Sequence, residues 1–151
     1  MLKLSKLADY ATVLMTAAAR EPARTLTGQE LAERTHVPLP TVAKLLKTLT
    51  RARLLESLRG AHGGYRLARP AEKISVADII KALEGPLAVT ACSVHNGECS
   101  IESDCATRAN WRLINTAIRE ALEAVTLAQM AHGGSAPIRA RTPREFPLIR
   151  A

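Results

Sequence analysis

Residues 27–51 read TGQELAERTHVPLPTVAKLLKTLTR, and this stretch decides the fold. Thr27 and Glu30 match a capping box, in which each side chain accepts a hydrogen bond from the backbone N–H of the other residue. We therefore predict a short helix over residues 28–35. The turn at residues 36–40 then places a proline at the start of a further helix, where its missing N–H costs nothing.

This further helix, over about residues 40–51, is predicted to bury one face and to present cations on another. Its apolar residues recur at spacings of one, three and four positions, as helix packing requires: Val42, Leu45, Leu46 and Leu49. Its other faces carry Thr41, Lys44, Lys47 and Arg51. Two short helices joined by a tight turn, the second of them basic on its exposed side, indicate a helix-turn-helix.

A β-hairpin is predicted directly after the helix-turn-helix. Residues 54–59 and 65–68 have the composition of two brief strands, and the glycines of residues 60–64 allow a tight tip between them. This hairpin is a wing, with Arg59 and His62 near its tip. A phosphate-binding enzyme loop is disfavoured, because no Gly-Lys-Ser/Thr follows the glycines.

Helices are also predicted on both sides of this core motif. Apolar spacing indicates one from Ser5 to about Arg20, and a capping signal at Ser75 starts another that ends near Glu84. After the cysteines, one apolar stripe runs over nearly five helical turns: Trp111, Ile114, Ile118, Ala121, Val125 and Ala128. We expect this helix to pair with its copy in a homodimer; docking back on the winged domain is the alternative.

The fold class is therefore predicted to be mainly α with a small β wing: a winged helix-turn-helix plus a long dimerisation helix. Only 3% of the residues are aromatic, so the core must be built from aliphatic side chains, which favours helices. Four segments are expected. They are a DNA-binding domain over 1–84, a cysteine-rich loop over 85–105, the dimerisation helix over 106–131 and a flexible basic tail over 132–151.

The charge of the chain is concentrated in its first part. Residues 1–84 have 14 basic and 8 acidic side chains. Between residues 38 and 69 only Glu56 opposes seven cations, which are Lys44, Lys47, Arg51, Arg53, Arg59, Arg66 and Arg69. Such an excess is typical of a face that binds the phosphates of double-stranded DNA.

Several other classes of protein are disfavoured. No stretch approaches the roughly 20 apolar residues of a membrane span or has the form of a signal peptide, so we expect a cytoplasmic protein with no membrane partner. The four histidines are scattered, with no carboxylate pair or nucleophile motif beside them. We therefore expect neither an enzyme nor a small-molecule substrate.

Three cysteines, Cys92, Cys99 and Cys105, lie within fourteen residues, and the rest of the chain has none. Their spacing is wider than the Cys-x2-Cys pairs of structural zinc sites. Thiolates on a loop can hold an iron-sulfur cluster, which needs about four ligands, so one ligand remains to be found. Bare thiols that sense oxidants, or a zinc-binding loop, are alternatives.

The sequence resembles the family of winged-helix regulators that includes the iron-sulfur assembly regulator IscR and the nitric-oxide regulator NsrR. Within this family it is most similar to the regulators of the SUF system. The resemblance spans about residues 1–130 and is carried by residues 4–11, 31–34 and 42–46, the wing at 59–67, the three cysteines and Trp111. It implies a homodimer on a palindromic operator that represses iron-sulfur assembly genes according to cluster status.

Two departures from the family pattern affect the implied ligands. IscR-like members have a histidine three residues after the last cysteine, where this chain has Arg108. NsrR-like members use an aspartate in the first helix of the partner subunit, and Asp9 stands at the matching place. The resemblance thus implies Cys92, Cys99, Cys105 and Asp9 as ligands, with a [4Fe-4S] cluster favoured over [2Fe-2S]. Local alternatives to Asp9 are His95, Glu98, Glu102 and Asp104.

DNA contacts are expected from the recognition helix and the wing. They are Pro40, Thr41, Lys44, Lys47 and Arg51 from the helix and Arg59 and His62 from the wing. Thr41 and Lys44 should face the major groove and Arg59 the minor groove. IscR-like members have a glutamate that shapes sequence preference where this chain has Ala43, so the same operator should not be assumed. An iron-sulfur carrier protein is the alternative from a different class, and the basic winged domain speaks against it.

Overall fold

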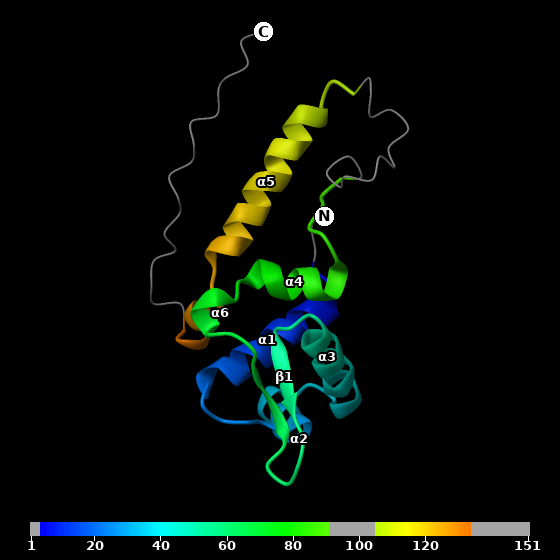
Figure 1. Ribbon diagram of the computed structural model, residues 1–151. Helices are drawn as coiled ribbons and strands as arrows, with labels where there is room; N and C mark the ends of the chain where they lie inside the picture. Colours follow the sequence, from blue (N-terminus) through cyan, green and yellow to red (C-terminus); the bar gives the residue numbers. More distant parts are fainter. Residues whose placement is uncertain (1–3, 91–104, 134–151) are drawn as a thin grey trace.

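The computed structural model describes residues 4–90 and 105–133. Its elements, in chain order, are α1 (Lys6–Arg20), α2 (Gly28–Thr35), α3 (Leu39–Arg51), β1 (Leu55–Leu58), β2 (Gly64–Leu67), the 3-10 turn η1 (Ala71–Lys73), α4 (Val76–Glu84), α5 (Arg108–Ala124) and α6 (Leu127–Ala131) (Figure 1). The predicted fold, mainly helical with a winged helix-turn-helix, is confirmed.

Side-chain caps fix where the helices begin. The Ser5 hydroxyl accepts a hydrogen bond from the N–H of Ala8 at the start of α1. The capping box predicted at Thr27 is present, with Thr27 Oγ1 accepting from Glu30 N and Glu30 Oε2 accepting from Thr27 N. Ser75 and Asp78 form a second capping box at α4. Each cap satisfies amides that have no partner within the helix, so short local motifs set these boundaries.

The core forms around α1, which packs against α2, α4 and α6. Ala8 and Ala11 are fully buried, and such small side chains let neighbouring helices approach closely. Aliphatic side chains fill the remaining space, among them Leu14, Met15, Leu45, Leu49, Ile79 and Leu127. Among the described residues no aromatic ring is fully buried, as the composition predicted.

The wing is a two-stranded antiparallel sheet, and Leu26 forms an isolated antiparallel β-bridge with Tyr65 of β2. Leu55 pairs with Leu67, and Leu58 pairs with Gly64. Leu26 N donates to Tyr65 O at 2.9 Å, and Tyr65 N donates to Leu26 O at 2.8 Å. This pairing anchors the wing to the loop before α2. The hairpin was predicted, whereas the contribution of Leu26 was not.

Gly64 is required where the wing meets Leu26. Its φ is +148°, and a Cβ there would lie 2.7 Å from the carbonyl oxygen of Leu26. Any other residue would collide with that backbone, so the base of the wing depends on this glycine.

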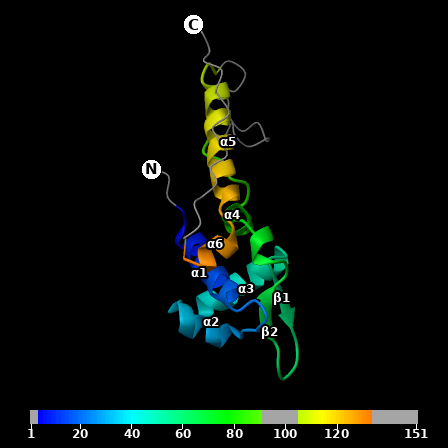
Figure 2. The same cartoon turned by 90° about the vertical axis from the view of Figure 1, so that its left-hand side faces the viewer.

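The prediction of one continuous helix through Ala128 is wrong. The helix α5 ends at Ala124, Val125 is extended, and α6 begins at Leu127. The backbone returns to the winged domain here: Val76 N donates to Val125 O at 3.0 Å, and Leu127 N donates to Ile74 O at 2.8 Å. A capping box between Thr126 and Gln129 then starts α6. Figure 2 shows α6 against α1, with α5 extending away from the winged domain.

Leu127→Ala should destabilise the fold, because Leu127 is fully buried in the core that α1 organises. We expect a loss of about 2–5 kcal/mol in the free energy of unfolding. Urea denaturation at fixed protein concentration measures it. The matched control is Leu39→Ala, since Leu39 is 44% exposed, and its effect should stay within about 0.5 kcal/mol. Equal effects of the two substitutions would contradict the docking of α6 on this core.

Candidate nucleic-acid interface and cysteine site

The recognition helix α3 has a buried face and an exposed face. The residues that point into the core are those predicted to do so: Val42, Leu45, Leu46 and Leu49. Of the predicted contact residues, Pro40, Lys44, Lys47 and Arg51 are exposed, and Thr41 is half-buried. The structure thus brings these five residues onto one helix whose cations are open to solvent.

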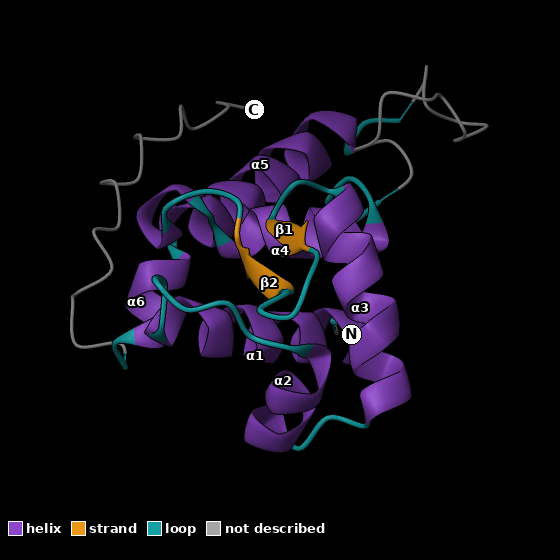
Figure 3. Ribbon diagram, turned by 60° about the horizontal axis from the view of Figure 1, so that its bottom comes forward, coloured by secondary structure: helices purple, strands orange, loops and turns teal. Residues whose placement is uncertain are grey.

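The turn between α2 and α3 uses an unusual backbone conformation. His36 has φ of +56° and ψ of +21°, which is the left-handed region, and it ends α2. Val37 follows and is buried at 5% exposure, which fixes the turn against the core. Pro40 lies in the first turn of α3, as predicted. Figure 3 shows α2 and α3 joined by this turn, with the wing strands beside them.

Two glycines shape the tip of the wing. Gly60 has φ of +108°, and a Cβ on Gly63 would lie 2.5 Å from the carbonyl oxygen of Leu58. Gly63 N donates to Gly60 O at 2.9 Å and closes the tip. Arg59 and His62 are exposed there, as predicted. Figure 1 shows this tip at the end of the molecule opposite α5.

Two of the seven cations counted in residues 38–69 are neutralised by acidic neighbours. Arg66 forms an ion pair with Glu56 across the wing strands. Arg69 Nη2 lies 3.6 Å from Asp78 Oδ2. No ion pair within residues 4–90 and 105–133 engages the other five, which are Lys44, Lys47, Arg51, Arg53 and Arg59. Within residues 38–69, the unpaired positive charge therefore lies on α3, on the corner after it and on the wing.

Arg53 was counted among the cations but was not predicted as a contact residue. It is exposed and has φ of +58°, at the corner between α3 and β1. The left-handed backbone conformation of Arg53 turns the chain sharply between the end of α3 and the start of β1. In the sequence, the only signal for Arg53 as a DNA-contact residue was its place in the run of cations, because no local motif distinguishes it from its neighbours.

A network of exposed ion pairs holds the loop between α1 and α2. Arg34 pairs with Glu21, and Arg24 lies 3.1 Å from Glu21 and 2.5 Å from Glu30. Hydrogen bonds from Arg34 and then Arg24 lower the pKa of Glu21 below its usual value. Such exposed pairs contribute little to stability. Their geometry joins the end of α1 to α2, which aligns the helix-turn-helix.

The cysteine site is described only in part. Cys92 and Cys99 lie outside the described residues, as do the alternative ligands His95, Glu98, Glu102 and Asp104. Cys105 is half-buried, and its Sγ lies 3.4 Å from Thr107 Oγ1. Hydrogen bonds from the side chain and backbone of Thr107 lower the pKa of the Cys105 thiol. A lowered pKa favours the thiolate, which is the form that binds metals.

Asp9 is exposed in the first turn of α1. Over the described ranges 4–90 and 105–133, no three His, Cys, Asp or Glu side chains gather closely enough to hold a metal ion. The predicted ligand set is thus neither assembled nor contradicted by these residues. Asp9 has the exposure that a ligand supplied to a second subunit requires.

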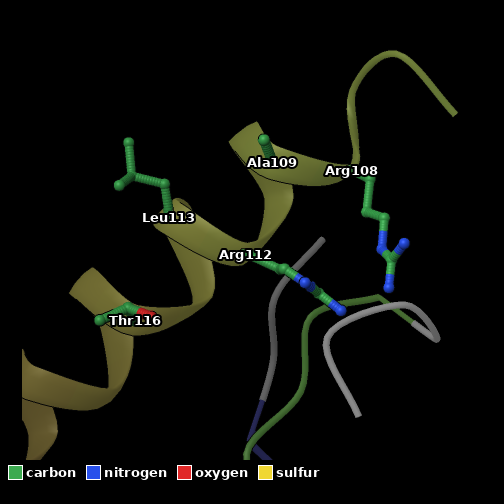
Figure 4. A pocket seen from close by; sticks show the side chains of 5 residues that line it. All are labelled: Arg108, Ala109, Arg112, Leu113 and Thr116. Atoms are coloured by element: carbon green, nitrogen blue, oxygen red, sulfur yellow. The ribbon is translucent and has the colours of Figure 1, made fainter. Parts of the chain in front are cut away.

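Arg108 occupies the first position of α5, where the IscR-like pattern has a histidine. Figure 4 shows the side chains of Arg108 and Arg112 extending from α5 on the side of the green loop that follows α4, whereas Leu113 points away from that loop. These residues line a shallow pocket together with Ala109 and Thr116. A guanidinium cannot serve as a metal ligand, so this end of α5 supplies positive charge beside the cysteine segment and no fourth ligand.

The helix α5 leaves an apolar face uncovered. Trp111, Leu113 and Ile114 are 37%, 47% and 43% exposed. Asn115, one turn after Trp111 on the same side of the helix, is buried and accepts a hydrogen bond from Val89 N at 3.1 Å. The helix α5 also packs against α4. Single exposed apolar residues are common, but three within one turn indicate a contact surface.

Comparisons with known proteins agree with this arrangement. Residues 4–133 match the family model described as "Rrf2: Iron-dependent Transcriptional regulator". The protein rrf2 of Nitratidesulfovibrio vulgaris is 32% identical over 135 residues, covering 89% of this chain and 90% of that protein. None of the described helices is both long and apolar enough to cross a membrane.

Two solved structures have a similar fold and sequence. CymR, the global cysteine regulator of B. subtilis, superposes with a TM-score of 0.71 at 30% identity, over 87% of this chain and 98% of that one. IscR of T. potens superposes with a TM-score of 0.68 at 32% identity, over 87% of each chain.

Proposed function

Because the chain belongs to the Rrf2 family of transcriptional regulators, we propose that it is a homodimeric repressor of iron-sulfur assembly genes that senses cluster status. It is a regulator with a DNA-binding fold and not an enzyme. The observation that carries the DNA-binding part of the proposal is the set of five cations on α3, its following corner and the wing that no described acid neutralises.

In the proposed complex α3 lies in the major groove and the wing reaches the minor groove. Lys44 is in the second turn of α3, where it can meet base edges, whereas Lys47 and Arg51 are placed for phosphates. Arg59, exposed at the wing tip, is suited to the negative potential of a narrow minor groove. His62 and Pro40 lie next to these contacts, and Thr41 offers a hydroxyl.

The proposed sensor consists of Cys92, Cys99, Cys105 and Asp9 of the partner subunit. The donor set fits a [4Fe-4S] cluster: three thiols, one of them with a lowered pKa, and an exposed carboxylate. A bound cluster would supply iron-thiolate bonds whose loss frees the ligands. Arg108 replaces the histidine of IscR-like members, which supports a ligand set of the NsrR-like kind.

The helix α1 is the proposed link between sensor and DNA. It has 15 residues and is therefore about 22 Å long. Its start is tied to the end of α4 by the hydrogen bond from Ser5 N to Glu84 Oε1 at 2.9 Å, just before the cysteine segment. Its other end leads into the ion-pair network that holds α2. A displacement of Asp9 on cluster binding or loss would thus be transmitted to the helix-turn-helix through α1, which moves as one helix.

A regulator whose thiols act without a cluster is the second candidate. The lowered pKa of Cys105 favours it, since a thiolate reacts faster with oxidants than a thiol does. A zinc-bound loop and an iron-sulfur carrier are further alternatives. Protein purified without oxygen separates them, because only a cluster gives charge-transfer bands in the visible range.

Arg59→Ala should weaken operator binding by about 1–3 kcal/mol, since it removes the exposed cation of the wing tip. Fluorescence anisotropy at moderate salt measures the affinity. Lys81→Ala is the matched control, because Lys81 is an exposed cation on α4 and belongs neither to α3 nor to the wing. Unchanged affinity of the Arg59 variant would remove the wing from the interface.

Cys99→Ala should abolish the visible chromophore of anaerobically purified protein and alter operator affinity, with the winged domain still folded. Asp9→Ala should keep a cluster that is lost more quickly, because three thiolates remain. Lys6→Ala, in the same turn of α1, is the control and should behave like the unaltered protein. If Asp9→Ala keeps normal spectra, cluster stability and cluster-dependent DNA binding, Glu98 or Asp104 becomes the better fourth ligand.

Ile114→Glu should disrupt the proposed dimer, which uses the exposed apolar face of α5. Ile114 is 43% exposed in the single chain, so the new charge harms the fold little but would be buried in a dimer interface. Sedimentation velocity should show a shift toward monomer. Arg119→Ala on the same helix is the control. A variant that remains fully dimeric would place the interface elsewhere.

A further inference from the structure

The recognition helix begins with apolar side chains at the end that should meet the bases. Leu39 is the first residue of α3 and is 44% exposed, and Pro40 and Ala43 are exposed beside it. The other large apolar residues exposed in the described part of the chain lie just before α1, on α1 or on α5. Leu39 is thus the one that the helix-turn-helix itself presents.

These three residues form one patch. Positions four and three apart on a helix are neighbours on its surface, so Leu39 and Pro40 both adjoin Ala43. Lys44 and Lys47 follow on the exposed side, nearer the middle of the helix. Leu39 and Ala43 are separated by about 6 Å along the helix, which corresponds to about two base steps of DNA.

The side chains of residues 38–51 restrict which bases this helix can recognise. This stretch, PLPTVAKLLKTLTR, contains no Asn, Gln, Asp, Glu or His. The usual amide contact to adenine and the usual carboxylate contact to cytosine are therefore missing from it. Arg51, which could bind guanine, lies about 18 Å along the helix from Leu39. An apolar contact with the C5-methyl group of thymine remains available at the first turn.

We infer that Leu39, Pro40 and Ala43 read thymine methyl groups in the major groove of each operator half-site. This inference rests on the proposed function and adds a specificity determinant to it. The half-sites should hold thymines at about two neighbouring positions where α3 enters the groove. Lys44 can bind a neighbouring guanine and Lys47 the flanking phosphates, whereas the apolar patch supplies the preference for thymine.

The test replaces thymine by deoxyuridine, which lacks only the C5-methyl group. The operator is first selected from a pool of random duplexes with the full-length protein. Each thymine of the half-site is then replaced in turn, and affinities are measured by anisotropy. We expect a loss of about three- to fivefold for each methyl group that the patch covers. Replacements outside these positions should change nothing.

Variants of the protein identify the residues that read the methyl groups. Leu39→Ala should bring the ratio of thymine to uracil affinities close to one at the position that Leu39 covers. Lys47→Ala is the control and should weaken binding to both operators by the same factor. Because Leu39 and Lys47 are exposed, both variants should fold, and thermal unfolding checks this.

The possible failures are distinguishable. Equal affinity for the thymine and uracil operators at every position would overturn this inference and leave sequence-specific DNA binding intact. A Leu39→Ala variant that weakens both operators equally would also overturn it, because Leu39 would then act without reading the methyl group. A selection that yields no preferred sequence would overturn the proposed function itself.

Discussion

The close packing of α1 against α2, α4 and α6 is the contact on which the rest of the structure depends. Fully buried alanines, such as Ala8 and Ala11, let these helices approach one another. The packing positions the helix-turn-helix. It also anchors α6, which follows the C-terminal end of α5 and so fixes that end to the winged domain. One helix thereby connects the end of the molecule that carries α5 with the end that carries the wing.

Much of this fold was readable from the sequence because its signals are local. The capping boxes at Thr27 and Ser75, and the apolar spacing of α3, each depend on residues within one or two turns. The wing was predicted in the same way, since glycines and short apolar runs are local features. The charge excess predicted a nucleic-acid interface within residues 38–69, and the structure shows that two of its seven cations, Arg66 and Arg69, are paired with acids.

Pairings between distant parts of the chain were missed. Nothing near Leu26 indicates that it pairs with Tyr65, and nothing in the stripe after Trp111 indicates that Val125 bonds to Val76. The apolar period continues across Val125, so periodicity alone predicted one helix there. The capping box at Thr126 was the local signal that could have divided it. The ligand set depends on residues outside the described ranges and on a second subunit, so it stays a proposal.

The central claim is that the state of the cysteine site governs DNA binding. Its most direct test is the operator affinity of one anaerobic preparation, measured before and after the iron is removed with a chelator. A ligand shifts an equilibrium only by its differential affinity for two states, so the account predicts that the two affinities differ by about fivefold or more. Equal affinities, with a visible chromophore present before chelation and absent after it, would contradict the account.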